Sequence, residues 1–177
     1  MNIINQNVFN IFFSLSTDPN IANISLFISN VLIYILFGIV FIYIILRSKF
    51  IFPHLFMAAG ASGGAWVVSK ILKYIIHIDR PFVALGLTPL FYESGFSFPS
   101  SHSAVFAALS VVVFALNRKL GILMIVCTIF IGLSRMVLGV HYPLDIIGGF
   151  AVGAIVGLVF LYIMKSRYAV AFFGKSL

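Results

Sequence analysis

The most conspicuous absence in this sequence of 177 residues is charge. Only 8% of the residues are Asp, Glu, Lys or Arg, whereas a soluble domain carries about 25%. Hydrophobic residues make up 62% of the chain, so a water-soluble globular fold is excluded and an integral membrane protein is expected. The same composition excludes an intrinsically disordered chain and a nucleic-acid-binding protein.

Acidic residues and cysteine are scarce as well. The chain has only four Asp and Glu residues, too few for a convincing two-metal site, so we expect no metal and no other cofactor. The single cysteine, Cys127, lies in an apolar run, which excludes a disulfide scaffold and favours a small core residue. The first 20 residues contain no Lys or Arg, so a cleaved signal peptide is not expected.

Long apolar runs are abundant, and a membrane span needs roughly 20 such residues. They predict an all-α, polytopic membrane bundle that forms one domain, with five transmembrane helices at 24–46, 51–78, 101–116, 121–140 and 143–164. Residues 79–100 form an outer loop. Glycines four residues apart in the second and fifth spans predict close helix packing.

The segment 1–20 is too short and too rich in amides to span a membrane. If it is helical, its apolar residues share one face, and they are Ile4, Val8, Ile11, Phe12 and Leu15. This pattern predicts an amino-terminal amphipathic helix that lies in the membrane interface.

Basic residues indicate orientation, because Lys and Arg accumulate in short cytoplasmic loops. Five alternating spans place seven of the 11 basic residues on one side: Arg47, Lys49, Arg118, Lys119, Lys165, Arg167 and Lys175. That side is therefore expected to be cytoplasmic, with the amino terminus outside and the carboxyl terminus inside. The net charge of +7 is then a topology signal, and it does not require a polyanionic partner.

The outer ends of spans two to five carry nearly every residue capable of chemistry. Lys73, Arg80 and Arg135 converge there with few acids beside them, which is typical of an anion site. Ser100 is expected to cap the third span, and free backbone N–H groups from Ser100 to His102 would add a phosphate cradle at the positive end of that helix.

Histidines at the same ends supply groups for a reaction. His141 and Asp145 are four residues apart at a helix start, so the carboxylate can hold one ring nitrogen and leave the other as a nucleophile. His102 can give a proton to a leaving group. Each residue alone has a structural alternative, such as a snorkelling Lys or Arg or a helix cap, and we interpret His54 and His77 as structural. Three separate segments bring such residues to the same side of the membrane, and this coincidence favours a phosphate site.

The spacing of these residues resembles three signatures of the phosphatidic acid phosphatase type 2 superfamily, K-x6-R-P, P-S-G-H and S-R-x5-H-x3-D. They read here as Lys73 to Arg80-Pro81, Pro99-Ser100-Ser101-His102, and Ser134-Arg135 with His141 and Asp145. The sequence departs from the family pattern in two ways. Ser101 stands where the common pattern has glycine, and we expect five spans, whereas many bacterial members resemble a six-span bundle.

The resemblance implies metal-free hydrolysis of a lipid phosphate through a phosphohistidine. It implies a multi-pass protein of the bacterial plasma membrane with its active site on the extracytoplasmic side. His141 would be the nucleophile, Asp145 its orienting partner and His102 the general acid. The residues that would bind the phosphoryl group are Lys73, Arg80, Ser100, Ser101 and Arg135.

The substrate class follows from the same resemblance. The bacterial members that this chain most resembles act on undecaprenyl diphosphate, which is the expected substrate, with membrane lipids as the surroundings. Phosphatidylglycerophosphate, phosphatidate and lipid A phosphates are alternatives. A lipid phosphotransferase with the same site and a non-enzymatic anion-binding membrane protein are the other functions considered. The sequence does not indicate an oligomeric state.

Overall fold

The computed structural model describes residues 3–167, and all regular structure in that range is helical. This confirms the all-α bundle predicted from the sequence. The elements, in chain order, are α1 (Ile3–Ser14), the 3-10 turn η1 (Leu15–Thr17), α2 (Pro19–Phe27), the π-helical turn η2 (Ile28–Leu32), α3 (Ile33–Arg47), α4 (Ile51–Ile76), α5 (Pro81–Ala84), α6 (Ser101–Leu116), α7 (Arg118–Val137) and α8 (Pro143–Arg167).

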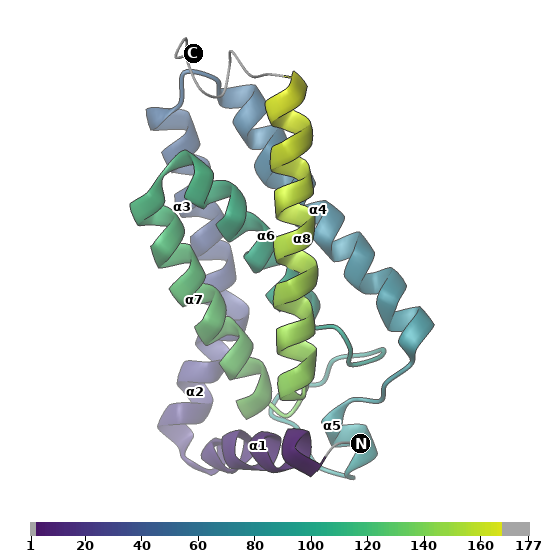
Figure 1. Cartoon of the computed structure of the whole chain (residues 1–177). Helices are drawn as coiled ribbons and strands as arrows, with labels where there is room; N and C mark the ends of the chain where they lie inside the picture. The colour runs from purple at the N-terminus through teal and green to yellow at the C-terminus, as the bar shows by residue number, and fades with distance from the viewer. Residues whose placement is uncertain (1–2, 168–177) are drawn as a thin grey trace.

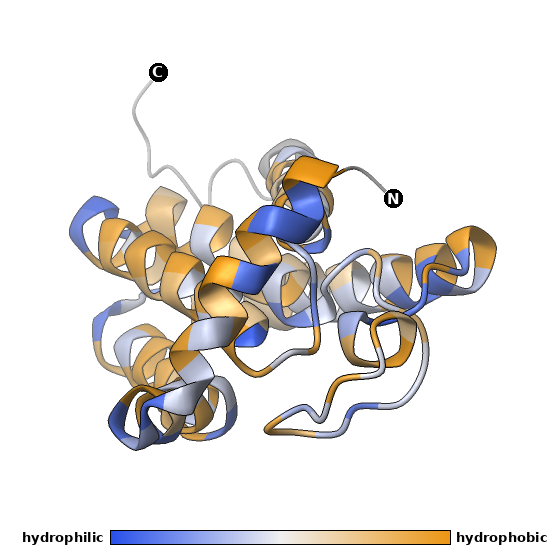
Figure 2. Ribbon diagram, turned by 90° about the horizontal axis from the view of Figure 1, so that it is seen from below, coloured by the Kyte–Doolittle hydropathy of each residue, from blue (hydrophilic) through white to orange (hydrophobic). Residues whose placement is uncertain are grey.

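The protein is a multi-pass membrane protein. Four helical segments are long and apolar enough to cross a membrane, and the apolar helix α6 is shorter; the four are Pro19–Arg47, Ile51–Ala84, Arg118–Val137 and Pro143–Met164. Apolar residues predominate along the helices in Figure 2, and many large ones are exposed, such as Phe52 and Ile75. An apolar surface of this kind is suited to contact with lipid.

The first span begins at Pro19, whereas the apolar run alone places its start at residue 24. The cause is a capping arrangement: an Asp18 carboxylate oxygen accepts a hydrogen bond from the Asn20 backbone N–H at 2.8 Å, and Pro19 occupies the first helical position. Both features favour a helix start. The predicted outer loop 79–100 contains one further helical turn, α5.

Helix α1 lies across the end of the bundle, beneath α7 and α8 (Figure 1). Its buried residue is Phe9, which meets the Tyr142 ring edge-on at a centroid distance of 5.3 Å. Part of the predicted amphipathic face is exposed, since Ile4 is 70% exposed and Ile11 is 63% exposed, whereas Val8 and Phe12 are half-buried. That this face lies in the membrane interface stays a prediction.

Glycine allows α6 and α8 to pack closely in the centre of the bundle. A methyl group added at Gly153 would collide with the Ala104 carbonyl oxygen and lie 2.7 Å from the Ala107 Cβ. Gly149 faces α6 in the same way. The contact brings the first turns of the two helices together, and the Ser100 N–H donates to the Asp145 carbonyl at 2.9 Å.

The basic residues predicted to be cytoplasmic lie on segments at the end of the bundle away from α1. Figure 1 shows that α3 ends, α4 and α7 begin, and α8 ends on that side. Six of the seven basic residues predicted to be cytoplasmic have a described backbone there: Arg47, Lys49, Arg118, Lys119, Lys165 and Arg167. Lys175 and residues 1–2 of the amino-terminal segment lie outside the described residues.

We expect Gly153→Ala to destabilise the bundle, because the added methyl group would force α6 and α8 apart at an overpacking cost of about 1–3 kcal/mol. Thermal unfolding in detergent measures the effect as a lower Tm. Gly63→Ala in α4 is the matched control, since a Cβ there meets nothing within 4 Å and alanine is the better helix former. An unchanged Tm for Gly153→Ala would contradict the packing role.

Candidate active site

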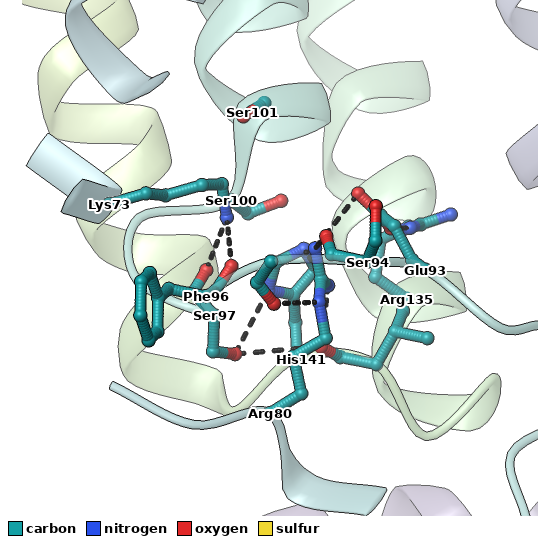
Figure 3. A network of polar contacts seen from close by, with 12 residues as sticks. Lys73, Arg80, Glu93, Ser94, Phe96, Ser97, Ser100, Ser101, Arg135 and His141 are labelled. Carbon is teal, nitrogen blue, oxygen red and sulfur yellow. Dashed lines mark hydrogen bonds and ion pairs between the residues drawn. The ribbon is translucent and has the colours of Figure 1, made fainter. Parts of the chain in front are cut away.

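The chemically capable residues gather where the loop between α5 and α6 meets the turn between α7 and α8. Figure 3 shows Lys73, Arg80, Arg135 and His141 in this region, with the backbone of residues 94–97 passing between them. The site lies at the end of the bundle that carries α1 (Figure 1). Segments far apart in sequence therefore meet, as the three motifs predict.

His141 and Asp145 form a buried pair at the start of α8. The His141 Nδ1 lies 3.4 Å from the Asp145 Oδ2, and the two side chains are at most 2% exposed. The same carboxylate oxygen accepts the Tyr142 backbone N–H at 2.7 Å, which fixes the carboxylate in the first turn. The other ring nitrogen, Nε2, lies 3.4 Å from the Arg80 Nη1. Nδ1 thus faces the carboxylate, and Nε2 faces the cations.

The surroundings of His141 favour its neutral form. Burial lowers its pKa well below the ordinary value of 6.5, and the positive charges of Lys73, Arg80 and Arg135 lower this pKa further. A neutral ring with its proton on Nδ1, toward Asp145, has an unshared electron pair on Nε2. This is the protonation state that a nitrogen nucleophile requires.

Arg80 is held rigidly by backbone carbonyls. Its Nε donates to the Gly95 oxygen at 2.9 Å, and its terminal nitrogens donate to the Val140 oxygen at 3.1 Å and to the Ser94 oxygen at 3.2 Å. Arg80 Nη2 also lies 3.0 Å from the Glu93 Oε1. The guanidinium is therefore fixed beside the His141 ring.

Arg135 reaches the same carboxylate from α7. Its Nη2 pairs with the Glu93 Oε2, and its Nη1 donates to the hydroxyl of Ser29. Ser29 is fully buried in the π-helical turn η2, a widened helix geometry that often occurs at functional sites. Arg80 and Arg135 thus converge, as the sequence predicts, with an acidic side chain between them.

Lys73 lies nearby but does not join the arginine pair in the contacts that the structure describes. Its ammonium donates to the carbonyl oxygens of Phe96 at 2.8 Å and of Ser97 at 2.7 Å. Lys73 therefore stabilises the backbone of the loop that carries Ser97, and its charge acts on the site from behind that backbone.

The start of α6 differs in part from the expectation. Ser100 caps the helix through its side chain, which accepts the Ser103 N–H at 3.4 Å. The prediction of a free Ser100 N–H is wrong, because this group donates to the Asp145 carbonyl. The Ser101 hydroxyl accepts a hydrogen bond from Ser69 in α4 at 3.1 Å, so it faces the helix contact and only its backbone is left to face a phosphate.

His102 is partly buried in the first turn of α6. Its Nδ1 is buried and has no hydrogen-bond partner among the described residues. The structure thus leaves this nitrogen unpaired near the predicted phosphate position, although no direct contact joins His102 to His141. His54, in contrast, lies toward the other end of the molecule and pairs with Ser48.

Sequence reasoning missed two residues of the site, Ser97 and Glu93. Ser97 is fully buried, and its hydroxyl donates to the Asp145 Oδ2 at 2.5 Å and lies 3.3 Å from the His141 Nδ1. The sequence places Glu93 in the predicted outer loop 79–100 but not between the arginines. Glu93 is one of only four acids in the chain, and this scarcity near three cations was the available signal; Ser97 had none beyond its position before the P-S-S-H motif.

The fold and the site together define a helical membrane protein with a buried histidine–carboxylate pair beside two arginines. Residues 51–169 match the PAP2 superfamily, and the chain belongs to this superfamily. The resemblance seen in the sequence is thereby confirmed.

Curated relatives with similar sequences carry several names. Undecaprenyl-diphosphatase BcrC of Bacillus subtilis (strain 168) is 35% identical over 104 residues, 58% of this chain and 54% of the relative. Phosphatidylglycerophosphatase B of the same strain is 37% identical over 98 residues, 49% of this chain and 46% of the relative. Lipid A 1-phosphatase of Rhizobium johnstonii is 32% identical over 115 residues, which are 62% of this chain and 46% of the relative. The chain spans about half the length of the curated relatives it matches.

Solved structures share the fold. LpxE of Aquifex aeolicus aligns with a TM-score of 0.66 at 24% identity, covering 91% of this chain and 96% of that one. A PAP2-type phosphatidylglycerolphosphate phosphatase from Bacillus subtilis aligns with a TM-score of 0.51 at 22% identity, covering 93% and 96%. At these identities, the likeness is one of fold.

We expect the His141 ring to stay neutral, with its proton on Nδ1, at pH 6, because burial and three cations lower its pKa. ¹⁵N NMR of imidazole-labelled protein in detergent measures the tautomer and the titration. The chain has only four histidines, so comparison with His141→Gln assigns the signal. A His141 signal that titrates at or above pH 6.5 would contradict this electrostatic account.

Proposed function

We propose that this protein hydrolyses a phosphate monoester or diphosphate of a membrane lipid through a phosphohistidine on His141. The observation that supports the proposal most directly is the pair of contacts on the His141 ring, with Asp145 at Nδ1 and Arg80 at Nε2. A phosphoryl group bound by Arg80 and Arg135 would lie next to the nucleophilic nitrogen. Positioning and charge stabilisation are the main requirements of phosphoryl transfer.

In the first step, the electron pair of His141 Nε2 forms a bond to phosphorus while the phosphorus–oxygen bond to the leaving group breaks. His102 gives a proton to the leaving oxygen. Because the nearby cations disfavour a protonated ring, His102 would hold this proton only when the bound phosphoryl anion offsets their charge. The imidazole becomes a phosphorylated cation, and the Asp145 carboxylate stabilises the proton that remains on Nδ1. Arg80 and Arg135 neutralise charge on the equatorial phosphoryl oxygens.

In the second step, water attacks phosphorus and the phosphorus–nitrogen bond breaks. His102, now neutral, takes a proton from that water, and the electron pair returns to His141 Nε2. Inorganic phosphate leaves, and both histidines have regained their starting states. The cycle needs no group beyond the side chains of this chain and water.

Ser97 would hold the nucleophile in the required tautomer. Its hydroxyl proton points to the Asp145 Oδ2 at 2.5 Å, which leaves its oxygen free to accept the His141 Nδ1–H at 3.3 Å. The hydroxyl thus forms a second link between ring and carboxylate, parallel to the direct contact. Ser97 acts through His141 and Asp145, so it is a positioning residue.

The substrate proposed is undecaprenyl diphosphate, reached from the outer face of a bacterial plasma membrane. Support comes from the relative named undecaprenyl-diphosphatase and from the basic residues on segments at the opposite end of the bundle, which favours a cytoplasmic position for that end. Phosphatidylglycerophosphate and lipid A phosphates are the competing substrates, because other relatives carry these names.

Purified protein is expected to release phosphate from undecaprenyl diphosphate in detergent with EDTA present. His141→Ala and His102→Ala should each lower the rate by about two to four orders of magnitude. The matched control is His77→Asn, which changes an exposed histidine whose ring packs on Phe96 but contacts neither His141 nor His102 among the described residues; it should retain activity. Phosphate release from the competing lipids, measured in parallel, ranks the substrates, and an added acceptor lipid detects phosphotransfer.

Several outcomes of this assay would contradict the proposal. A strict requirement for a divalent metal would overturn the mechanism. Near-normal rates in His141→Ala would overturn the phosphohistidine and favour a non-enzymatic anion-binding protein or another nucleophile. Transfer of phosphate to an acceptor lipid in place of water would make the protein a phosphotransferase with the same site.

Ser97→Ala should lower kcat by about ten- to a hundredfold and leave KM nearly unchanged, because a hydrogen bond to a charged group contributes about 1.5–3 kcal/mol. Ser97→Thr keeps the hydroxyl and should recover most of the rate. Steady-state kinetics on the preferred lipid measures both parameters. An equal loss in the alanine and threonine variants would indicate a packing role only.

A further inference from the structure

The carboxylate of Glu93 occupies the space between the two arginines. Its Oε1 lies 3.0 Å from the Arg80 Nη2, and its Oε2 pairs with the Arg135 Nη2 (Figure 3). One carboxylate thus bridges two guanidinium groups, each through a different oxygen. A phosphoryl group, with several acceptor oxygens, would use the same donors.

This bridge also lies beside the nucleophile. Arg80 is the shared neighbour, because Nη2 contacts Glu93 while Nη1 lies 3.4 Å from the His141 Nε2. A phosphoryl group placed for attack by Nε2 and bound by both arginines would therefore displace Glu93. The carboxylate and the transferring group compete for one position.

The two arginines are anchored independently of Glu93, whereas Glu93 is free to leave. Both guanidinium side chains are 1% exposed and have other partners, backbone carbonyls for Arg80 and Ser29 for Arg135. The Glu93 side chain is 21% exposed. Withdrawal of Glu93 would thus leave the arginines in place.

A cavity gives the side chain room to move. It has a volume of about 550 Å³ and is lined by Phe82, Val83, Tyr92, Glu93, Ser94 and Gly95. The Phe82 and Tyr92 rings pack edge to face at a centroid distance of 5.7 Å and support its wall. Rotation of Glu93 into this space would not require the helices to separate.

The charge balance favours exchange for a doubly charged anion. Two buried cations, Arg80 and Arg135, contact the carboxylate of Glu93, so this cluster carries one net positive charge in the resting site. With Glu93 withdrawn, the net charge is two positive, which matches a phosphate dianion. A buried site close to neutrality costs less desolvation free energy than one with unpaired charge.

We propose that Glu93 is an internal competitor for the phosphoryl group: it neutralises the arginine pair in the empty site and is displaced into the adjacent cavity when a lipid phosphate binds. The inference rests on the proposed function, since it assigns the phosphoryl position. Glu93 thereby weakens the apparent affinity of the site for any anion, because only the state with Glu93 withdrawn can bind one. Its return to the arginines after the second step favours release of inorganic phosphate.

Calorimetric titration of purified protein with inorganic phosphate at pH 8, without lipid substrate, tests the inference. Glu93→Gln should bind phosphate at least about tenfold more tightly than the unaltered protein, which corresponds to a competent state populated to about 10% or less. Glu93→Asp keeps the charge but is one methylene shorter, so it cannot bridge both guanidiniums and should also bind more tightly. The matched control is Asp79→Asn, which removes one exposed negative charge without an arginine contact and should change the affinity less than about twofold.

The outcomes separate this inference from the proposed function. Equal or weaker phosphate binding in both Glu93 variants overturns the competitor role, and so does equal tightening in Asp79→Asn, which would indicate general electrostatics. Absence of phosphate binding in every variant and in the unaltered protein overturns the anion site, and with it both proposals. Tight binding by Glu93→Gln, together with no lipid hydrolysis by the unaltered protein, contradicts the proposed function alone.

Discussion

Burial of positive charge at the end of an apolar bundle is the constraint on which the site depends. Lys73, Arg80 and Arg135 are at most 3% exposed, and a buried cation is destabilising unless it is paired and hydrogen-bonded. The partners come mainly from the backbone of residues 94–97 and from Val140. The loop before α6 therefore folds around the cations, and the cations determine the path of that loop.

Helix packing deeper in the bundle fixes the other half of the site. A methyl group at Gly149 would lie 2.5 Å from the Ser100 carbonyl oxygen, so only glycine lets the first turns of α6 and α8 approach this closely. The approach allows the Ser100 N–H to bond to the Asp145 carbonyl. Small residues usually interpreted as packing features thus hold Asp145 in position against the first turn of α6.

The helices and the motif residues could be predicted from the sequence because their signals are local. The apolar run 101–116 lies between the capping residues Ser100 and Asn117 and forms α6 over those residues, and fixed spacings indicated His141 beside Asp145. Ser97 and Glu93 could not be placed, because their roles depend on the path of an irregular loop. That path follows from contacts with Lys73 and the arginines, which no local pattern encodes.

The same cations serve two steps of the proposed chemistry. In the empty site, they lower the pKa of His141 and so keep the nucleophile unprotonated. A bound phosphate dianion offsets their field, which reduces the cost of the positive ring that forms when Nε2 is phosphorylated. Glu93 offsets only one positive charge, whereas a phosphate dianion offsets two. Exchange of Glu93 for the dianion therefore makes the field at the His141 ring less positive, as formation of the phosphorylated cation requires. Substrate binding and activation of the ring are thereby coupled through one group of charges.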